Sequence, residues 1–417
     1  MKVRRVAAVM LTTIGVALVA ATPAGAVPAT IYVATTGLAG NPGRDCHTAA
    51  FSTISSAVAA ASPGDTIIVC PGVYHEDVIV NKALHLIGHD VTIDASGLEN
   101  AMQIVASNVA VNGFTFVNAN GEGLLAGVDS EADFHLLPQP PVLTNITVFY
   151  VAAIDNNKGF NGTENGNCKY PGDCGGGIHF NGVQNSSIQL AYVIRNADGI
   201  LLTDDYAPTA HNLIERNAVN DNTKECGIVL AAHNPGAVST VTNADGSMSA
   251  TGRNPDVGGV YDNEIRFNIT LRNGTATAPP EFGSGGSGSG IGIFGSGPGT
   301  GAYDNITEAN YMQGNGLAGF TIHAHHPGGE DVNGNQVINN VFDTNNVGGD
   351  AFDGGVKNFE TTGIAVYSVP PTSMTISGNT IRNNAIGIWL TNTVTAAGLE
   401  TNTFQSVTTP IVVQPAN

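Results

Sequence analysis

The sequence is poor in charged residues, and poorest in positively charged ones. Charged residues make up 12% of the 417 residues, and 15 Lys and Arg stand against 34 Asp and Glu, so the formal net charge is −19. A chain this acidic argues against nucleic acid as a partner, because nucleic acid requires a basic surface, and we expect none. The shortage of cations also weighs against a strongly anionic polysaccharide, because its charge would have to be neutralised.

Long apolar runs are also missing, apart from one at residues 6–21 that follows three basic residues. That run is too short to span a bilayer, so we expect no membrane span. Ala24-Gly25-Ala26 behind it has the small residues of a cleavage site, and the whole pattern predicts a signal peptide over residues 1–26. Its removal would change the formal net charge from −19 to −22, since three cations leave with it. We therefore expect a secreted protein, and a monomer.

Cysteine is scarce, with five residues, but a secreted protein meets an oxidising environment. We expect one disulfide between Cys46 and Cys70 and another between Cys168 and Cys174. Cys226 is left over at the start of a predicted strand, where it is either a buried, inert thiol or a nucleophile. No Cys and His spacing resembles a zinc site, so we expect no metal and no cofactor, and no motif supports a calcium ion.

Glycine is abundant, with 53 residues, and much of it belongs to a repeated phrase in which Gly precedes alternating apolar residues. Successive copies lie 22 to 63 residues apart, as in a solenoid with one copy in each coil. The first and third residues after Gly are apolar throughout, which predicts strands with those positions facing a core. The copies begin at Gly177, Gly199, Gly227, Gly290, Gly319, Gly363 and Gly387.

Asparagine recurs at intervals of five before these strands, as in Asn212, Asn217 and Asn222. Asn tolerates left-handed backbone and bonds the main chain at turns. Stacked on successive coils, such residues would form amide ladders. They could instead be sugar ligands, but their spacing follows the coil, which favours the ladder.

A helix is predicted before the repeats, because Ile54, Val58 and Ala61 recur at helical spacing and Ser62-Pro63-Gly64 ends the run. Short strands follow it up to residue 93. A solenoid requires such a helix at its end, because the open core of its first coil must be covered.

The segment from Phe51 to Gly88, FSTISSAVAAASPGDTIIVCPGVYHEDVIVNKALHLIG, resembles the start of right-handed parallel β-helix proteins of the pectin-lyase-like superfamily. The later Asn and Gly phrases resemble the coil repeats of the same group. The resemblance implies an all-β chain: a right-handed parallel β-helix solenoid with an N-terminal amphipathic capping helix. We expect the cap and first coils over residues 27–100 and the β-helix over 101–417, as a single domain.

The superfamily includes pectate and alginate lyases, polygalacturonases, pectin methylesterases, uronate epimerases and proteins without catalysis. The Arg-x-Pro-x-x-Arg phrase of pectate lyases and the Asp-Pro-His of alginate epimerases are absent here. Asn196-Ala-Asp-Gly199 and Asp204-Asp205 resemble parts of the polygalacturonase set, but its Gly-His-Gly and Arg-Ile-Lys are missing. No characterised catalytic set therefore transfers to this chain.

The even positions after each Gly should face outward, and several carry groups capable of proton transfer. Equal positions on adjacent coils lie about 4.8 Å apart, which should gather these groups at one edge of one sheet. The gathering implies an elongated groove for a linear polymer, walled by insertions at residues 156–176, 237–258 and 276–288. Our candidate catalytic residues are Asp204, Asp205, His233, His323, His325 and Tyr367, and our candidate substrate-binding residues are Thr203, Lys224, His326 and Trp389.

Asp205 and His233 hold the same position on adjacent coils, and a carboxylate beside an imidazole fixes its tautomer and raises its basicity. We expect an enzyme acting on an extracellular polysaccharide, either a lyase or a hydrolase. In a hydrolase two carboxyls flank the bond, with Asp204 or Asp205 as one and Glu330 or Asp331 as the other. The alternatives are a non-catalytic polysaccharide-binding or surface protein with the same groove, and a structural spacer.

Overall fold

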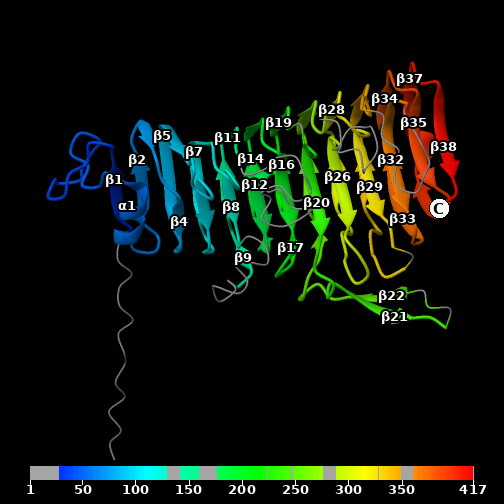
Figure 1. The fold of residues 1–417 in the computed structure, drawn as a ribbon, viewed down its shortest axis with the longest axis horizontal. Helices are drawn as coiled ribbons and strands as arrows, with labels where there is room; N and C mark the ends of the chain where they lie inside the picture. The colour runs from blue at the N-terminus through cyan, green and yellow to red at the C-terminus, as the bar shows by residue number, and fades with distance from the viewer. Residues whose placement is uncertain are drawn as a thin grey trace, which may run out of the picture.

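The computed structural model describes residues 28–128, 141–158, 176–222, 224–244, 246, 248–275, 288–326, 328–348 and 360–416. In these residues the chain winds as a right-handed parallel β-helix, with the strands of successive coils paired side by side. Figure 1 shows the coils stacked in chain order along one axis. The all-β solenoid expected from the sequence is confirmed. The signal peptide and the Cys168–Cys174 pair lie outside the described residues.

One wall of the solenoid is an eleven-stranded sheet that carries all seven Gly phrases. Its register is the one given by aligning the phrases on Gly, with Ile200 beside Ile228 and Leu202 beside Leu230. The strands follow chain order: β4 (Val78–Val80), β6 (Met102–Ile104), β8 (Leu124–Ala126), β12 (Gly176–Asn181), β16 (Asp198–Thr203), β20 (Ile228–Ala232), β26 (Ile291–Gly295), β29 (Phe320–Ala324), β32 (Thr362–Ser368), β35 (Ile386–Thr391) and β38 (Thr409–Gln414).

The opposite wall is a twenty-one-stranded sheet, to which most coils contribute two short strands. Its first strands are β1 (Thr30–Val33), β2 (Thr66–Val69), β3 (Gly72–Tyr74), β5 (His85–Asp94), β7 (Ala110–Val117), β10 (Thr147–Phe149), β11 (Ala152–Ile154), β14 (Ser187–Gln189) and β15 (Tyr192–Ile194). The later ones are β18 (Leu213–Glu215), β19 (Ala218–Asn220), β24 (Glu264–Arg266), β25 (Ile269–Leu271), β27 (Ile306–Glu308), β28 (Tyr311–Gln313), β30 (Gln336–Ile338), β31 (Val341–Asp343), β33 (Thr372–Ser377), β34 (Thr380–Arg382), β36 (Val394–Ala397) and β37 (Thr403–Gln405).

Smaller elements complete the coils. Four short strands pair in parallel between the walls: β9 (Leu143–Thr144), β13 (Val183–Gln184), β17 (Thr209–Ala210) and β23 (Val260–Tyr261). Part of the insertion at 237–258 forms an antiparallel hairpin of β21 (Val238–Thr242) and β22 (Met248–Arg253), which extends along one side of the solenoid in Figure 1. A 3₁₀ turn, η2 (Leu399–Thr401), lies near the C-terminus.

The core lies between the two walls, and the repeated Gly marks where the walls approach each other most closely. Ile228 and Leu230, the first and third residues after Gly227, are fully buried, and the other copies behave alike. A Cβ on Gly199 would lie 2.4 Å from Cγ1 of Val219 on the opposite wall. Glycine recurs there because no side chain fits between the strand and the facing core residue.

The predicted Asn ladders are confirmed and run through the interior. Nδ2 of Asn217 donates to Oδ1 of Asn268 at 2.9 Å, and Nδ2 of Asn268 donates to Oδ1 of Asn310 at 3.0 Å. Each amide also reaches a main-chain carbonyl of the preceding coil, as Asn268 does to Ile214 at 2.8 Å. The ladders thereby satisfy backbone groups at the coil corners, where no strand partner is present.

Left-handed backbone at these turns belongs to the residue before each ladder Asn: Arg216 has a φ of 56° before Asn217, and Phe267 has a φ of 55° before Asn268. The ladder Asn must point inward to reach its neighbours. The chain therefore turns one residue earlier, where the side chain faces solvent.

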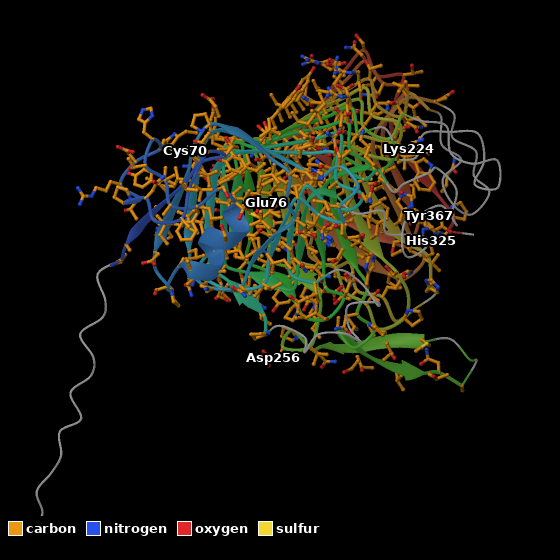
Figure 2. The ribbon with its side chains drawn as sticks, turned by 60° about the vertical axis from the view of Figure 1, so that its left-hand side comes forward. Cys70, Glu76, Lys224, Asp256, His325 and Tyr367 are labelled. Carbon is orange, nitrogen blue, oxygen red and sulfur yellow. A yellow bond between two sulfur atoms is a disulfide. The ribbon has the colours of Figure 1, made fainter. Side chains whose placement is uncertain are left out.

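A helix, α1 (Ile54–Ala60), forms where the sequence predicts it. Thr53 caps its N-terminus, and Glu76 accepts from the main-chain N–H groups of Ile54 and Ser55 at 2.7 and 2.9 Å. Its buried face joins the apolar core, and it lies at the N-terminal end of the solenoid in Figure 1, with Glu76 beside it in Figure 2. Whether the helix is what shields this end of the core remains a prediction.

The cysteines that lie in described segments agree with the sequence interpretation. Cys46 and Cys70 form a disulfide. Cys226 is a buried free thiol, and burial, helped by nearby Asp198, raises its pKa well above the ordinary value, which opposes a role as a nucleophile. Across the described segments, no helix is long and apolar enough to cross a membrane.

Candidate functional site

A row of polar side chains crosses the outer face of the eleven-stranded sheet and ends at His233. Glu122 contacts Nδ1 of His179 at 3.3 Å, and Nε2 of His179 contacts Oγ1 of Thr203 at 2.9 Å. That hydroxyl donates to Oδ2 of Asp205 at 2.8 Å, and Oδ1 of Asp205 meets Nδ1 of His233 at 2.6 Å. Glu122, His179 and Thr203 are buried, so the row leads from the interior to the partly exposed His233.

Asp205 is held as a carboxylate by its neighbours. Its own burial opposes ionisation, but the hydrogen bond and charge of His233 outweigh that effect and lower the pKa of Asp205 below its ordinary value. Nδ2 of Asn181 adds a donor at 2.6 Å. A carboxylate only accepts hydrogen bonds, so the proton of a neutral His233 ring sits on Nδ1 and Nε2 is its basic nitrogen.

Asp204 points the other way and serves the main chain. It accepts from the N–H groups of His233 at 2.6 Å, Asn234 at 3.2 Å and Gly259 at 2.5 Å. Burial raises the pKa of Asp204 to about 6, although these N–H groups favour the ionised form. Asp204 therefore fixes the backbone that carries His233, and it does not line the pocket described next.

A pocket of about 260 Å³ opens on the outer face, over β16, β20 and β26. His233 is part of its wall, with Phe294 and Ser296. Apolar side chains make its floor, and two carboxyl groups lie in its wall. The other lining residues are Asp198, Leu201, Glu225, Cys226, Val229, Ala231 and Gly295.

His323, His325, Tyr367 and Trp389 form an aromatic stack on later coils, and its first ring, that of His323, lies 5.3 Å from the ring of Phe294 in the pocket wall. The ring centroids of His323 and His325 are 5.6 Å apart, and those of His325 and Tyr367 are 5.3 Å apart. Figure 2 labels His325 and Tyr367 near each other. The rings of Tyr367 and Trp389 stack at 6.4 Å. The predicted single cluster is thus divided into a polar row and an aromatic stack.

Several predicted site residues are less accessible than the sequence suggested. His323, Tyr367 and Trp389 face outward from the sheet but are at most 6% exposed, and Asp204 is fully buried against the main chain. Alternation along a strand tells which face of the sheet a side chain takes, but not what lies over that face. With its ring 1% exposed, Trp389 is not positioned here to stack on a sugar.

The remaining candidates lie at the margins. Nδ1 of His326 is 3.1 Å from Oε1 of the buried Glu330, whose pKa is raised by burial. Lys224 is exposed and lies next to the pocket residue Glu225 in the sequence. Asp331 is bound to Nε of Arg253 at 2.7 Å, which anchors the β21–β22 hairpin rather than placing Asp331 in the pocket.

Sequence reasoning missed the two carboxyl groups of the pocket, Asp198 and Glu225. Asp198 precedes Gly199 and Glu225 lies two residues before Gly227, and the alternation was counted only forward from each Gly. Both nevertheless line the pocket on the outer face. A search for acidic residues just before each Gly phrase would have found both.

Metal ligation has no support among the described side chains, since no three His, Cys, Asp or Glu residues within the described ranges are placed to hold an ion together. The site contains four groups that can exchange protons and bond hydroxyls: the imidazole of His233, its carboxylate partner Asp205, and the pocket carboxyls of Asp198 and Glu225.

No protein-family model matches the sequence, and no curated protein does. The pectate lyase Pel9A has a similar fold, with 14% identity and a TM-score of 0.49 over 92% of this chain and 80% of that one. The A-module of the mannuronan C-5 epimerase AlgE4 of Azotobacter vinelandii has 13% identity and a TM-score of 0.49, over 87% and 94%. A family 28 exopolygalacturonase of Yersinia enterocolitica has 12% identity and a TM-score of 0.43, over 94% and 78%. These identities assign no residue a role.

Proposed function

We propose that the chain is a secreted glycoside hydrolase that cleaves a neutral extracellular polysaccharide in the pocket over β16, β20 and β26. The observation that carries the proposal is the 2.6 Å contact between Nδ1 of His233 and Oδ1 of Asp205 at the wall of that pocket. Secretion rests on the signal-like residues 1–26 and agrees with the Cys46–Cys70 disulfide.

His233 acts as the general base. Asp205 holds the ring by Nδ1, which makes Nε2 the nitrogen that takes a proton from the attacking water. The row from Glu122 through His179 and Thr203 holds Asp205 in turn, so the ring orientation is set from the interior. Held in this way, the imidazole enters the reaction with little reorganisation.

The acid comes from the other end of the pocket. Asp198 lies at the start of β16, and Glu225 lies one coil further on, where its N–H donates to the carbonyl of Ala197 at 3.0 Å. One of these carboxyls protonates the leaving oxygen, and the other bonds ring hydroxyls. Acid and base then approach the glycosidic bond from its two sides, as hydrolysis requires.

The charge of the pocket favours hydrolysis over elimination. Among the residues that the structure describes, the ionisable side chains in its wall are Asp198, Glu225, His233 and the buried Cys226, with no Lys or Arg. A lyase must hold a uronate carboxylate beside the proton that it removes, and two carboxyls in the pocket would repel that group. A neutral sugar meets no such repulsion, and its hydroxyls can donate to both carboxyls.

A panel of polysaccharides tests the proposal. We expect new reducing ends from a neutral glucan, xylan or mannan and none from polygalacturonate or alginate. Ultraviolet-absorbing unsaturated products from either acidic polymer would replace the hydrolase by a lyase. Binding to a polymer with neither product would leave a non-catalytic binding protein. Glu225→Gln and Asp198→Asn should each lower cleavage of the neutral polymer, and unchanged rates in both would remove the assigned acid.

A further inference from the structure

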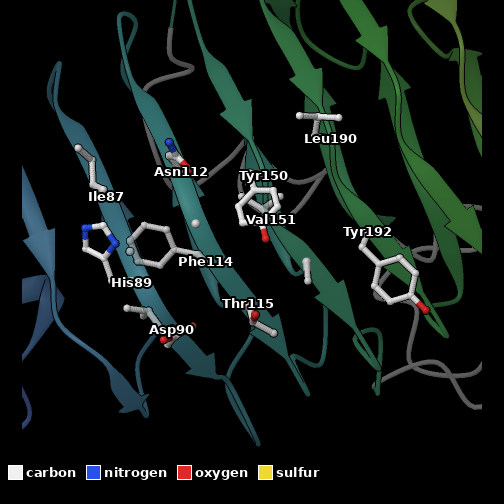
Figure 3. Close-up of a pocket in the computed structure, with 14 residues that line it drawn as sticks. Ile87, His89, Asp90, Asn112, Phe114, Thr115, Tyr150, Val151, Leu190 and Tyr192 are labelled. Atoms are coloured by element: carbon white, nitrogen blue, oxygen red, sulfur yellow. The ribbon is translucent and has the colours of Figure 1, made fainter.

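A second hollow, of about 520 Å³, lies on the twenty-one-stranded sheet near the N-terminal end of the solenoid. It is formed by β5, β7 and the turns that lead into β11 and β15, so it shares no residue with the pocket at His233. Figure 3 shows the side chains that surround it, with Tyr150 near the middle and Tyr192 to one side. Nothing in the proposed hydrolysis uses this surface.

The hollow exists because two glycines face each other where β5 and β7 bend. A Cβ on Gly113 would lie 2.3 Å from the carbonyl oxygen of Gly88, and one on Gly88 would lie 2.6 Å from that of Gly113. The register of β5 on β7 shifts at the same point, after Ile87. The two strands therefore leave a depression without side chains, bordered by the residues of the next coils.

Tyr150 projects from a left-handed turn beside the hollow. Its φ is 51° and it is 67% exposed. The equivalent turn position is Gly113 in the coil before, and later coils place Leu190, Arg216, Phe267, Ala309 and Asn339 there, all with positive φ. The backbone angle is therefore common to the column. What sets Tyr150 apart is that its exposed ring lines the hollow together with Tyr192.

The groups around the hollow suit a sugar better than a charged ligand. Tyr150 and Tyr192 present rings with a polar tip, and Tyr192 is 44% exposed. His89, Asn112 and Thr115 add hydrogen-bonding groups beside Asp90. No Lys or Arg of the described ranges lines the hollow, which disfavours an anionic polymer. Flat rings beside a few polar groups match the apolar faces and hydroxyls of a pyranose.

We propose that this hollow is a second, non-catalytic saccharide site that holds the neutral polysaccharide while another part of the chain is cut. The identity of the polymer rests on the proposed function, but the binding itself does not. Tyr150 and Tyr192 are the platform, and Asn112 and Thr115 bond the hydroxyls. Because the site is on a different sheet from His233, it anchors the polymer without entering the reaction.

Tyr150→Asn is the test variant, because Asn suits the left-handed turn and should leave the melting temperature unchanged or raised. Phe267→Asn is its matched control: Phe267 is also exposed, has a φ of 55° and holds the equivalent turn position on a later coil, outside the hollow. Binding of the full-length protein to hydroxyethyl cellulose, xylan, galactomannan and polygalacturonate is measured by affinity electrophoresis. Cleavage of a short neutral oligosaccharide is measured in parallel.

We expect Tyr150→Asn to weaken binding to at least one neutral polymer by about tenfold, the value of one good aromatic contact, with Phe267→Asn unchanged. Oligosaccharide cleavage should stay the same in both variants. Equal binding by Tyr150→Asn and the parent, equal loss in both variants, or no binding to any neutral polymer would overturn the second site. If the protein binds a neutral polymer through Tyr150 but cleaves none of the substrates, this second site would be supported and the proposed hydrolase activity would be contradicted.

Discussion

Nδ1 of His233 lies 2.6 Å from Oδ1 of Asp205, although the two residues are 28 apart in the sequence. They meet because Thr203 pairs with Ala231 in the sheet. Asp205 and His233 each lie two residues beyond one of these partners, so they hold the same position on adjacent coils. Asp205 is in turn held by Thr203, and Thr203 by His179. The geometry of this candidate site is thus set by the register of the strands in the solenoid.

Thr203→Val should lower kcat without changing KM, because it removes the hydroxyl that orients Asp205 but touches no substrate. We expect a loss of roughly tenfold, equivalent to about 1.4 kcal/mol. Thr203→Ser should restore most of the rate. Steady-state kinetics on the neutral polymer provides the measurement.

Thr270→Val is the control for that substitution. Thr270 is also fully buried, but its hydroxyl has no hydrogen-bond partner among the described residues. Its partners on the two adjacent strands of the sheet are Val219 and Met312. It should keep full activity and melt at the same or a higher temperature. A kcat loss in Thr270→Val equal to that of Thr203→Val would mean that any buried threonine matters.

Asp204 and Asp205 should affect stability against pH in opposite ways. Burial raises the pKa of Asp204 from 3.8 to about 6, so the folded state holds its proton more tightly than the unfolded state. The stability from Asp204 is fully present below about pH 3.8 and is lost as pH rises through about 6, by about 3 kcal/mol. Asp204→Asn should remove this decline between pH 4 and 7.

Asp205 has a lowered pKa, so its contribution is present above about pH 3.8 and is lost only as pH falls further. Asp205→Asn should therefore not remove the decline that is assigned to Asp204. Denaturant titrations at several pH values follow both variants. The same slope in Asp204→Asn and the parent protein would show that Asp204 stays ionised when folded.

Asn268→Ala should destabilise the solenoid severely, because it breaks one interior ladder. Asn217, Asn310 and the carbonyl of Ile214 would lose their partners, and each buried group left unpaired costs about 1–3 kcal/mol. Asn339→Ala, at an exposed left-handed turn, should cost only about 1 kcal/mol. Comparable midpoints for the two variants in a denaturant titration would contradict the structural role of the ladder.

Ile54→Asp should unfold the first coils, since it places an unpaired charge in the buried face of α1. Ala59→Asp, on the exposed face of the same helix, should melt like the parent. Thermal unfolding of the purified variants decides the matter. If Ile54→Asp melts cooperatively at the parental temperature, then α1 does not cap the core.

The fold was open to prediction because each coil repeats the same local demands. The apolar residues after Gly227 and Gly290 had to face a core, and the spacing of Asn212, Asn217 and Asn222 had to follow the coil. Once the copies were aligned, the neighbours Asp205 and His233 followed without further information. Register is shared by all coils, so one alignment places many residues.

The burial of side chains on the outer face of the eleven-stranded sheet could not be predicted in the same way. Tyr367 and Trp389 take the predicted face but are buried, because burial there depends on segments that do not repeat. Asp198 lines the pocket although it precedes Gly199, and counting the alternation forward from Gly does not reach it. The hollow at Tyr150 depends on the approach of Gly88 to Gly113, a tertiary contact that no local pattern records.

The most direct measurement is the turnover of His233→Ala on the neutral polysaccharide, beside His211→Ala as the control. His211 is a half-exposed histidine 3.9 Å from a carboxylate of Asp262, outside the pocket. We expect His233→Ala to fold and melt nearly as the parent does but to lose about 10²–10⁴-fold in kcat, and His211→Ala to keep full activity. Full activity in a folded His233→Ala protein would contradict the proposed reaction.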